Sequence, residues 1–220
     1  MTAAEAIAAL EALGWIRLAT GDWSWVLASP DGAQAARVSP WDAAYRMHAE
    51  FCRDAPSPYL QRIDAILPLG DLGHVVVMER LYPAPEDRAA ALCAALALSG
   101  DSDSPPPEGV DDSAFKADPE IRRLREGVLA LAERGARLPF WGGFDVRPGN
   151  VMADATVQLK LIDPIFVAGR KIVDAIVARD RDALARLPAG ALAAFFTIPV
   201  FEDGGGELAV AVAEMGLAGI

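Results

Sequence analysis

Three polar side chains in the second half of the chain have types and spacing that suit chemistry on phosphate groups. Asp145 and Asn150 stand in the order D-x-x-x-x-N, and Asp163 ends an apolar run thirteen residues after Asn150. A carboxylate can orient an attacking hydroxyl, and carboxylate and amide oxygens are the ligands that Mg²⁺ prefers. Pro148 and Gly149 favour a tight loop before Asn150. The sequence therefore predicts Asp145 as a catalytic carboxylate, with Asn150 and Asp163 as metal ligands.

The composition indicates a globular chain and limits its partners. Hydrophobic residues make up 53% of the 220 residues, which is ample for a core. The net charge of −11 disfavours nucleic acid and anionic membrane as partners. The start of the chain lacks the basic segment of a signal peptide, and no apolar run reaches the roughly 18–20 residues of a membrane span. We therefore expect a cytoplasmic location.

The cysteines and histidines do not form a closely spaced set. Cys52 and Cys93 lie far apart in the sequence, as do His48 and His74. Neither a disulfide framework nor a zinc site is expected from this spacing. No catalytic Cys–His arrangement follows from it either.

The N-terminal half has the pattern of a small sheet. Thr2 and Glu5 form a capping box that predicts a short helix, which Gly14 ends. The expected strands, separated by turn residues, cover 15–19, 23–27, 35–38, 63–67 and 74–78. A helix over 42–53 follows the third strand. This order, β-β-β-α-β-β, suits an antiparallel sheet with one helix against it.

Helices dominate the remainder of the chain. They are expected over 86–98, 120–137, 172–187, 189–196 and 208–215, with one buried strand over 157–162. The acidic, proline-rich stretch 100–112 predicts a flexible loop. After Asp163 the chain is expected to enter a helix directly. The predicted fold class is α+β, with a sheet first and a mainly helical part after it.

The segment Gly142-Gly143-Phe144-Asp145-Val146-Arg147-Pro148-Gly149-Asn150, with Leu161-Ile162-Asp163-Pro164 after it, resembles the kinase-like superfamily. The resemblance is strongest to the aminoglycoside and choline phosphotransferase branch. There the catalytic loop is often similar to H-G-D-x-x-P-G-N, and proline often follows the metal aspartate. Here the histidine is absent and Gly143 stands in its place. The resemblance implies a bilobal protein-kinase-like fold, with an N-lobe at 1–82 and a C-lobe at 83–220, and ATP and Mg²⁺ as cofactors.

The resemblance also implies roles for residues of the N-lobe. The turn after Thr20, with Gly21, Asp22 and Ser24, would cover the nucleotide phosphates, although it departs from G-x-G-x-x-G. In the hinge, the Glu79 carbonyl and the Leu81 N–H would bind the adenine edge.

Arg37 stands where such families place a phosphate-binding lysine, and residues 1–115 contain no lysine. Glu50 on the following helix is its expected ion-pair partner, since Ala43, Met47 and Glu50 share a face. Arginine keeps the charge of lysine but differs in shape.

These features leave three hypotheses open. The first is an ATP- and Mg²⁺-dependent phosphotransferase that moves the γ-phosphoryl group to a hydroxyl on a protein or a small molecule. The second is a pseudokinase that acts as a nucleotide-binding or regulatory module, which Arg37 and the poor glycine turn favour. The third is an unrelated α+β domain. The sequence also leaves open the possibility of an exposed aromatic patch, formed by Trp23, Trp25 and Trp41.

Overall fold

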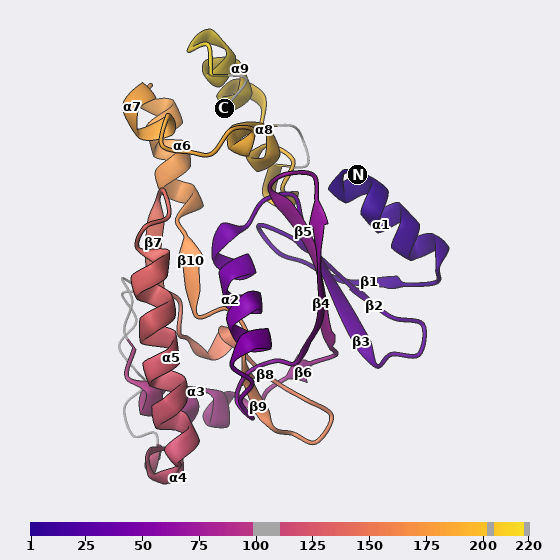
Figure 1. The fold of residues 1–220 in the computed structure, drawn as a ribbon, viewed down its shortest axis with the longest axis vertical. Helices are drawn as coiled ribbons and strands as arrows, with labels where there is room; N and C mark the ends of the chain where they lie inside the picture. Colours follow the sequence, from indigo (N-terminus) through magenta and orange to yellow (C-terminus); the bar gives the residue numbers. More distant parts are fainter. Residues whose placement is uncertain (99–110, 202–204, 218–220) are drawn as a thin grey trace. The chain divides into compact units, whose positions relative to one another are not determined.

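A computed structural model describes residues 1–98, 111–201 and 205–217 of the chain (Figure 1). The chain divides into two compact units. The first comprises Met1–Ala43, Ala65–Val77 and Val167–Ile220, and the second Ala44–Asp64 and Met78–Phe166. The lobes at 1–82 and 83–220 remain a prediction, and residues 100–110 of the predicted acidic loop lie outside the described residues. None of the described helices is long and apolar enough to cross a membrane.

A five-stranded antiparallel sheet forms the centre of the first unit, which confirms the predicted α+β class. Its strand order is β1-β2-β3-β5-β4. The strands are β1 (Ile16–Thr20), β2 (Trp25–Ala28), β3 (Gln34–Ser39), β4 (Ile63–Leu69) and β5 (Gly73–Glu79). The last residues of β5 and the first of β4 belong to the second unit. Trp25 faces Val38 in the antiparallel register of β2 and β3.

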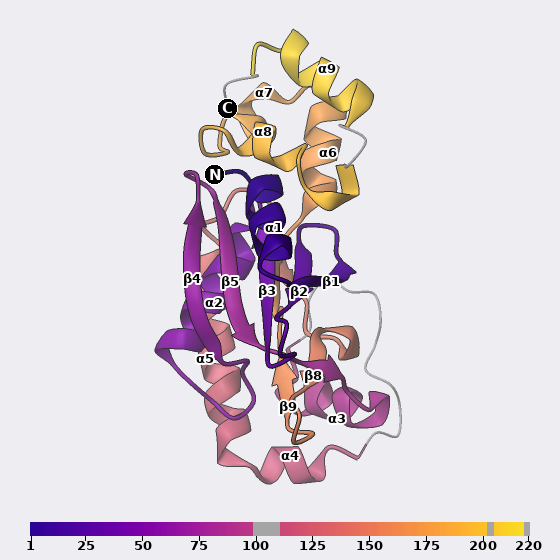
Figure 2. The ribbon, with the colours of Figure 1, turned by 90° about the vertical axis from the view of Figure 1, so that its right-hand side faces the viewer.

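Helix α1 (Ala3–Ala12) packs on this sheet, as Figure 2 shows. The predicted capping box is confirmed: the Thr2 N–H donates to Glu5 Oε2 at 2.8 Å, and the Glu5 N–H donates to Thr2 Oγ1 at 3.2 Å. Ile7 joins a buried cluster with Leu27 and Val38 of the sheet. The helix therefore starts from a local signal and is held by tertiary packing.

The C-terminal segment of the first unit consists of short helices. They are α6 (Gly169–Val177), α7 (Arg181–Leu184), α8 (Ala191–Phe195), the 3-10 helix η2 (Pro199–Phe201) and α9 (Gly206–Glu214). The single helix expected over 172–187 is wrong. Arg179 has a φ of 54°, which ends α6, and the Asp180 carboxylate then caps α7 by accepting from the Ala183 N–H.

An aromatic cluster joins this segment to the sheet within the first unit. The Phe195 ring lies 5.5 Å from Trp23 and 6.3 Å from Trp41, between ring centroids. Trp41 is 3% exposed and Trp25 8%, so the exposed aromatic patch is wrong. Trp41 is a core residue because the C-terminal segment covers it, whereas Trp25 is buried in the cluster with Ile7 of α1.

The second unit combines helices with short strands. Its elements are α2 (Ala43–Asp54), β6 (Tyr82–Pro83), α3 (Glu86–Leu96), α4 (Ser113–Ala117), α5 (Pro119–Gly135), β7 (Trp141–Phe144), the 3-10 helix η1 (Pro148–Asn150), β8 (Val151–Ala153), β9 (Leu159–Leu161) and β10 (Ile165–Val167). The first residue of α2 and the last of β10 belong to the first unit. The β8–β9 hairpin is antiparallel, and β6 pairs with β8. The helix expected directly after Asp163 is wrong, since β10 pairs with β7 first. Gly142 makes room there, because a Cβ at that position would meet the Phe166 ring.

Tyr59 forms hydrogen bonds with two elements of the second unit, the start of α5 and the strand β9. Its hydroxyl donates to Asp118 Oδ2 at 2.6 Å, while Asp118 Oδ1 accepts from the Glu120 N–H at the start of α5. The Tyr59 carbonyl accepts from the Leu161 N–H of β9 at 2.8 Å. Burial, followed by the hydrogen bond to Asp118 and its charge, raises the pKa of Tyr59 to about 12.

We expect Tyr59→Phe to lower the free energy of unfolding by about 1–2 kcal/mol, because Asp118 loses a hydrogen bond. The folded-state pKa exceeds the ordinary value of 10. The contribution is therefore complete below pH 10 and is lost as the pH rises from 10 towards 12. Urea unfolding at neutral pH and across this range measures both effects. Tyr82→Phe, at a residue that is 41% exposed, is the control, and equal stability of Tyr59→Phe and wild type would contradict the expectation.

Candidate active site

The Asn150 side chain brings the predicted motif together. Its Nδ2 donates to the Asp145 carbonyl at 2.8 Å, to Asp145 Oδ2 at 2.7 Å and to the Asp163 carbonyl at 3.1 Å. Three acceptor oxygens around one atom identify that atom as the amide nitrogen. Asn150 is 9% exposed, so this is an interior hub. All three residues belong to the second unit.

Main-chain hydrogen bonds hold the motif on its strands. The Asp145 N–H donates to the Pro164 carbonyl at 2.8 Å, and the Ile162 N–H donates to the Asn150 carbonyl at 3.0 Å. Gly143 has a φ of +104°, a conformation that residues with a side chain rarely adopt. This backbone favours glycine at position 143.

Both carboxylate oxygens of Asp145 have a donor. Oδ2 accepts from Asn150, and Oδ1 accepts from Arg147 Nε at 2.8 Å. The Arg147 side chain is 60% exposed, and such surface ion pairs contribute about 0–1 kcal/mol. A hydroxyl that approaches Asp145 can therefore replace Arg147 at small cost, while Asn150 keeps the carboxylate in place.

The donor set suits Mg²⁺. Because the Asn150 nitrogen faces three acceptors, the Asn150 Oδ1 oxygen is left to act as a ligand. Among the described residues, no three His, Cys, Asp or Glu side chains are grouped so that they could hold a metal alone. Mg²⁺ commonly takes one or two protein oxygens and completes its shell with water and substrate phosphates. Asn150 and Asp163 together fit that pattern.

Arg37 and Glu50 form ion pairs with other residues. Arg37 Nη2 lies 2.9 Å from Asp42 Oδ2, with both side chains largely buried in the first unit. Glu50 Oε1 lies 3.2 Å from Arg46 Nε, one turn away on α2. Arg37 and Glu50 belong to different units, so the expected Arg37–Glu50 pair remains a prediction. Asp42 follows β3 closely enough to meet Arg37 within the same unit, and Arg46 is a helical neighbour of Glu50. A role of Arg37 in phosphate binding remains a prediction.

The turn after β1 is closed and packed. The Gly21 N–H donates to the Ser24 carbonyl at 2.9 Å, and the Asp22 carbonyl accepts from the Val200 N–H at 3.3 Å. The Ser39 hydroxyl donates a hydrogen bond to the Trp23 carbonyl at 2.9 Å. Ser24 is 4% exposed, which withdraws its hydroxyl from solvent. The phosphate-covering role of Gly21, Asp22 and Ser24 remains a prediction.

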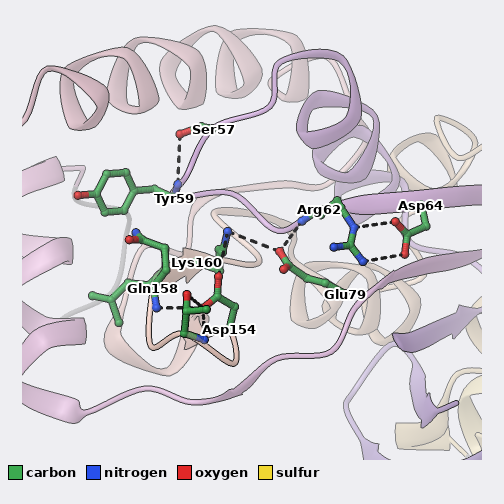
Figure 3. Close-up of polar contacts among 10 residues, drawn as sticks. Ser57, Tyr59, Arg62, Asp64, Glu79, Asp154, Gln158 and Lys160 are labelled. Carbon is green, nitrogen blue, oxygen red and sulfur yellow. Dashed lines mark hydrogen bonds and ion pairs between the residues drawn. The ribbon is translucent and has the colours of Figure 1, made fainter. Parts of the chain in front are cut away.

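The predicted hinge begins at Glu79, the last residue of β5. Its Oε1 accepts from the Arg62 N–H at 2.7 Å and lies 3.6 Å from Lys160 Nζ (Figure 3). The half-buried Leu81 follows two residues later. Adenine binding by the main chain of Glu79 and Leu81 remains a prediction. The sequence interpretation missed Lys160, although it is one of three lysines and interrupts an apolar strand.

A cysteine and a histidine also meet on one face of α2. Cys52 Sγ lies 3.4 Å from His48 Nε2, and both residues are buried. Their i, i+4 spacing on a helix could have revealed this contact. Burial raises the pKa of the Cys52 thiol, so it remains protonated and unreactive. The pair is a core contact, which the sequence analysis did not predict.

Two pockets are formed without the motif residues. One of about 800 Å³ in the first unit is mostly apolar, with Trp25, Phe196 and Phe201 in its wall. One of about 330 Å³ in the second unit is lined by Arg53, Lys160 and other residues. The walls of both are formed by residues other than Asp145, Asn150 and Asp163.

Comparison with known proteins gives remote structural similarity. No protein-family profile matches the sequence, and no curated protein sequence matches it. Similar solved structures include an aminoglycoside phosphotransferase of Streptomyces rimosus, with 14% identity, a TM-score of 0.35, and coverage of 98% of this chain and 99% of the other. Another is a thermostable mutant of a second aminoglycoside phosphotransferase, in a ternary complex with ADP and hygromycin B. It has 13% identity, a TM-score of 0.32, and coverage of 95% of this chain and 83% of the other.

Proposed function

We propose that this chain is an ATP- and Mg²⁺-dependent phosphotransferase that moves the γ-phosphoryl group to a hydroxyl on a protein or a small molecule. The Asn150 hub supports this proposal, because it fixes the Asp145 carboxylate and holds the main chain of Asp163 beside it. Such a fixed arrangement suits phosphoryl transfer, since positioning and charge stabilisation supply most of the catalysis.

In the proposed reaction, Asp145 orients the acceptor hydroxyl through Oδ1, in place of Arg147. The hydroxyl oxygen forms a bond to the γ-phosphorus, the bond from that phosphorus to the β,γ-bridging oxygen breaks, and ADP leaves. The hydroxyl proton passes to Asp145. Asn150 keeps the other carboxylate oxygen fixed during this step.

Asn150 and Asp163 would hold Mg²⁺, which when bound neutralises charge on the phosphates. Arg37 would contact the α- and β-phosphates, with Asp42 orienting its guanidinium. The main chain at Glu79 and Leu81 would bind the adenine edge.

A pseudokinase is the second candidate, and the first unit favours it. Arg37 is already engaged by Asp42, and the packed turn buries Ser24. Both features leave fewer hydrogen-bond donors and less positive charge on the sheet for binding phosphates. In this case the chain binds a nucleotide as a regulatory module and transfers nothing.

A thermal-shift titration with ATP, with and without Mg²⁺, tests the proposal on wild type and Asp163→Ala. A ligand at about 100 times its dissociation constant adds roughly 2.7 kcal/mol to the free energy of unfolding. We expect a Mg²⁺-dependent rise in Tm for wild type that Asp163→Ala loses. Asp174→Ala removes a carboxylate from a surface ion pair on α6 and should behave as wild type. A rise independent of Mg²⁺ and Asp163 would favour the pseudokinase, and no rise would contradict both candidates.

A further inference from the structure

Lys160 is a buried charge in an apolar strand. It is 8% exposed, and its neighbours Leu159 and Leu161 in β9 are both 0% exposed. A lysine in such a place is rare unless it is paired, because a buried ammonium loses its hydration.

Two carboxylates flank the ammonium group. Lys160 Nζ lies 3.6 Å from Glu79 Oε1 and 3.6 Å from Asp154 Oδ2. Asp154 is fixed from its other side, because Oδ1 accepts from the Thr156 N–H, the Thr156 hydroxyl and the Gln158 N–H at 2.7–3.0 Å (Figure 3). Burial alone would raise the pKa of Asp154, but these hydrogen bonds and the charge of Lys160 lower it. A charged carboxylate therefore stands opposite Lys160.

Glu79 is held between Lys160 and the main chain of Arg62. The Arg62 N–H donates to Glu79 Oε1 at 2.7 Å, and the Glu79 N–H donates to the Arg62 carbonyl at 3.1 Å. The Arg62 side chain turns away to Asp64, with Nε 2.8 Å from Oδ1. Lys160 is thus the side-chain link from Glu79 to the β8–β9 hairpin.

That hairpin connects directly to the candidate metal site. Strand β8 begins immediately after Asn150, and β9 ends two residues before Asp163. The hinge runs on from Glu79 into β6, which pairs with β8 through Tyr82 and Ala153. One end of the Lys160 network therefore lies at the proposed adenine site, and the other lies in the hairpin that the proposed metal ligands Asn150 and Asp163 flank in the sequence. Both ends belong to the second unit.

We propose that Lys160 is a positioning residue that sets the distance between the hinge backbone at 79–81 and the Asn150–Asp163 motif. A single ATP molecule contacts both sites only if they are correctly spaced, and its affinity then exceeds that of either half because the second contact is intramolecular. This inference rests on the proposed function. It assigns Lys160 no contact with the nucleotide.

Calorimetric titration of Lys160→Met with Mg²⁺-ATP, adenosine and Mg²⁺-tripolyphosphate tests the inference. We expect the affinity for ATP to fall about tenfold, while the affinities for adenosine and tripolyphosphate stay close to wild type. In steady-state ATP hydrolysis, the KM for ATP rises by a similar factor and kcat changes little, because Asp145 is untouched.

Matched variants distinguish a change in the spacing of the two sites from a general loss of folding. Lys116→Met removes an exposed lysine that pairs with Asp112 one helical turn away, and it should leave all three affinities unchanged. Lys160→Arg keeps the charge and should restore most of the affinity for ATP. If Lys160→Met does not fold, Glu79→Gln removes the same ion pair, yet its Oε1 can still accept from the Arg62 N–H.

Each outcome decides something different. Equal losses for ATP and for both fragments would overturn the inference, since Lys160 would then support the fold in general. If Lys160→Met folds and its affinity for ATP is unchanged, the inference about Lys160 is overturned and the proposed function is not affected. A wild-type chain that binds none of the three probes would overturn the proposed function and this inference together.

Discussion

Asp145→Asn is expected to lower the rate of ATP turnover by about 10²- to 10⁴-fold, the usual contribution of a general base. The substitution keeps the size of the side chain but removes its ability to take a proton. The loop should persist, because Asn150 also donates to the Asp145 carbonyl, which the substitution leaves in place. The affinity for Mg²⁺-ATP should therefore stay nearly unchanged. Hydrolysis of ATP, with water as the acceptor, measures turnover without knowledge of the natural acceptor, and calorimetry measures affinity.

The matched control for this variant is Asp174→Asn. Asp174 also accepts from an arginine at the surface, Arg170, but lies on α6 away from the motif in sequence. It should retain wild-type turnover. If Asp145→Asn lost affinity and turnover equally, Asp145 would be a binding or structural residue, and the proposed catalytic role would be wrong.

Phe195→Ala is expected to lower the free energy of unfolding by about 3–5 kcal/mol, the usual cost of removing a buried aromatic ring. Phe195 is 1% exposed, and its ring lies 5.0–6.3 Å from Trp23, Trp41, Phe196 and Phe201. Trp23 belongs to the turn after β1, so the loss should also loosen that turn. Urea unfolding, followed by tryptophan fluorescence, measures the change.

Val200→Ala is the control for the aromatic cluster. Val200 lies in the same C-terminal segment but is 58% exposed, and such surface changes stay within about 0.5 kcal/mol. A loss below about 1 kcal/mol for Phe195→Ala would show that the segment around α8 does not cover the tryptophans. The turn with Gly21 and Asp22 would then be open, which would favour a phosphate-covering role for it.

Local signals in the sequence were sufficient for most secondary structure of the N-terminal half. The Thr2–Glu5 capping box, the turn residues and the short apolar runs predicted α1 and all five strands of the sheet. They sufficed because each signal acts within a few residues. The prediction of one helix over 172–187 was wrong because no local signal marks its interruption. The sequence does not distinguish an arginine with positive φ, such as Arg179, from a helical one.

The sequence also determined which residues of the motif belong together. The order and spacing of Asp145, Asn150 and Asp163 predicted a common site, and the Asn150 hydrogen bonds bring them together. Their roles in catalysis and metal binding remain predictions. The loop from Asp145 to Asn150 is short and directly follows β7. The backbone therefore has few ways to arrange these residues, and their spacing was enough to predict that they meet.

The tertiary structure alone decided which charged side chains meet. Arg37 pairs with Asp42, the Tyr59 hydroxyl donates to Asp118, and Lys160 joins Glu79 to Asp154. No periodicity relates Lys160 to Glu79, which lies far away in the sequence, and any carboxylate could satisfy the same ammonium. Its partners depend on how the strands pack: here the packing brings two carboxylates within 3.6 Å of the buried ammonium, which would be costly to bury unpaired.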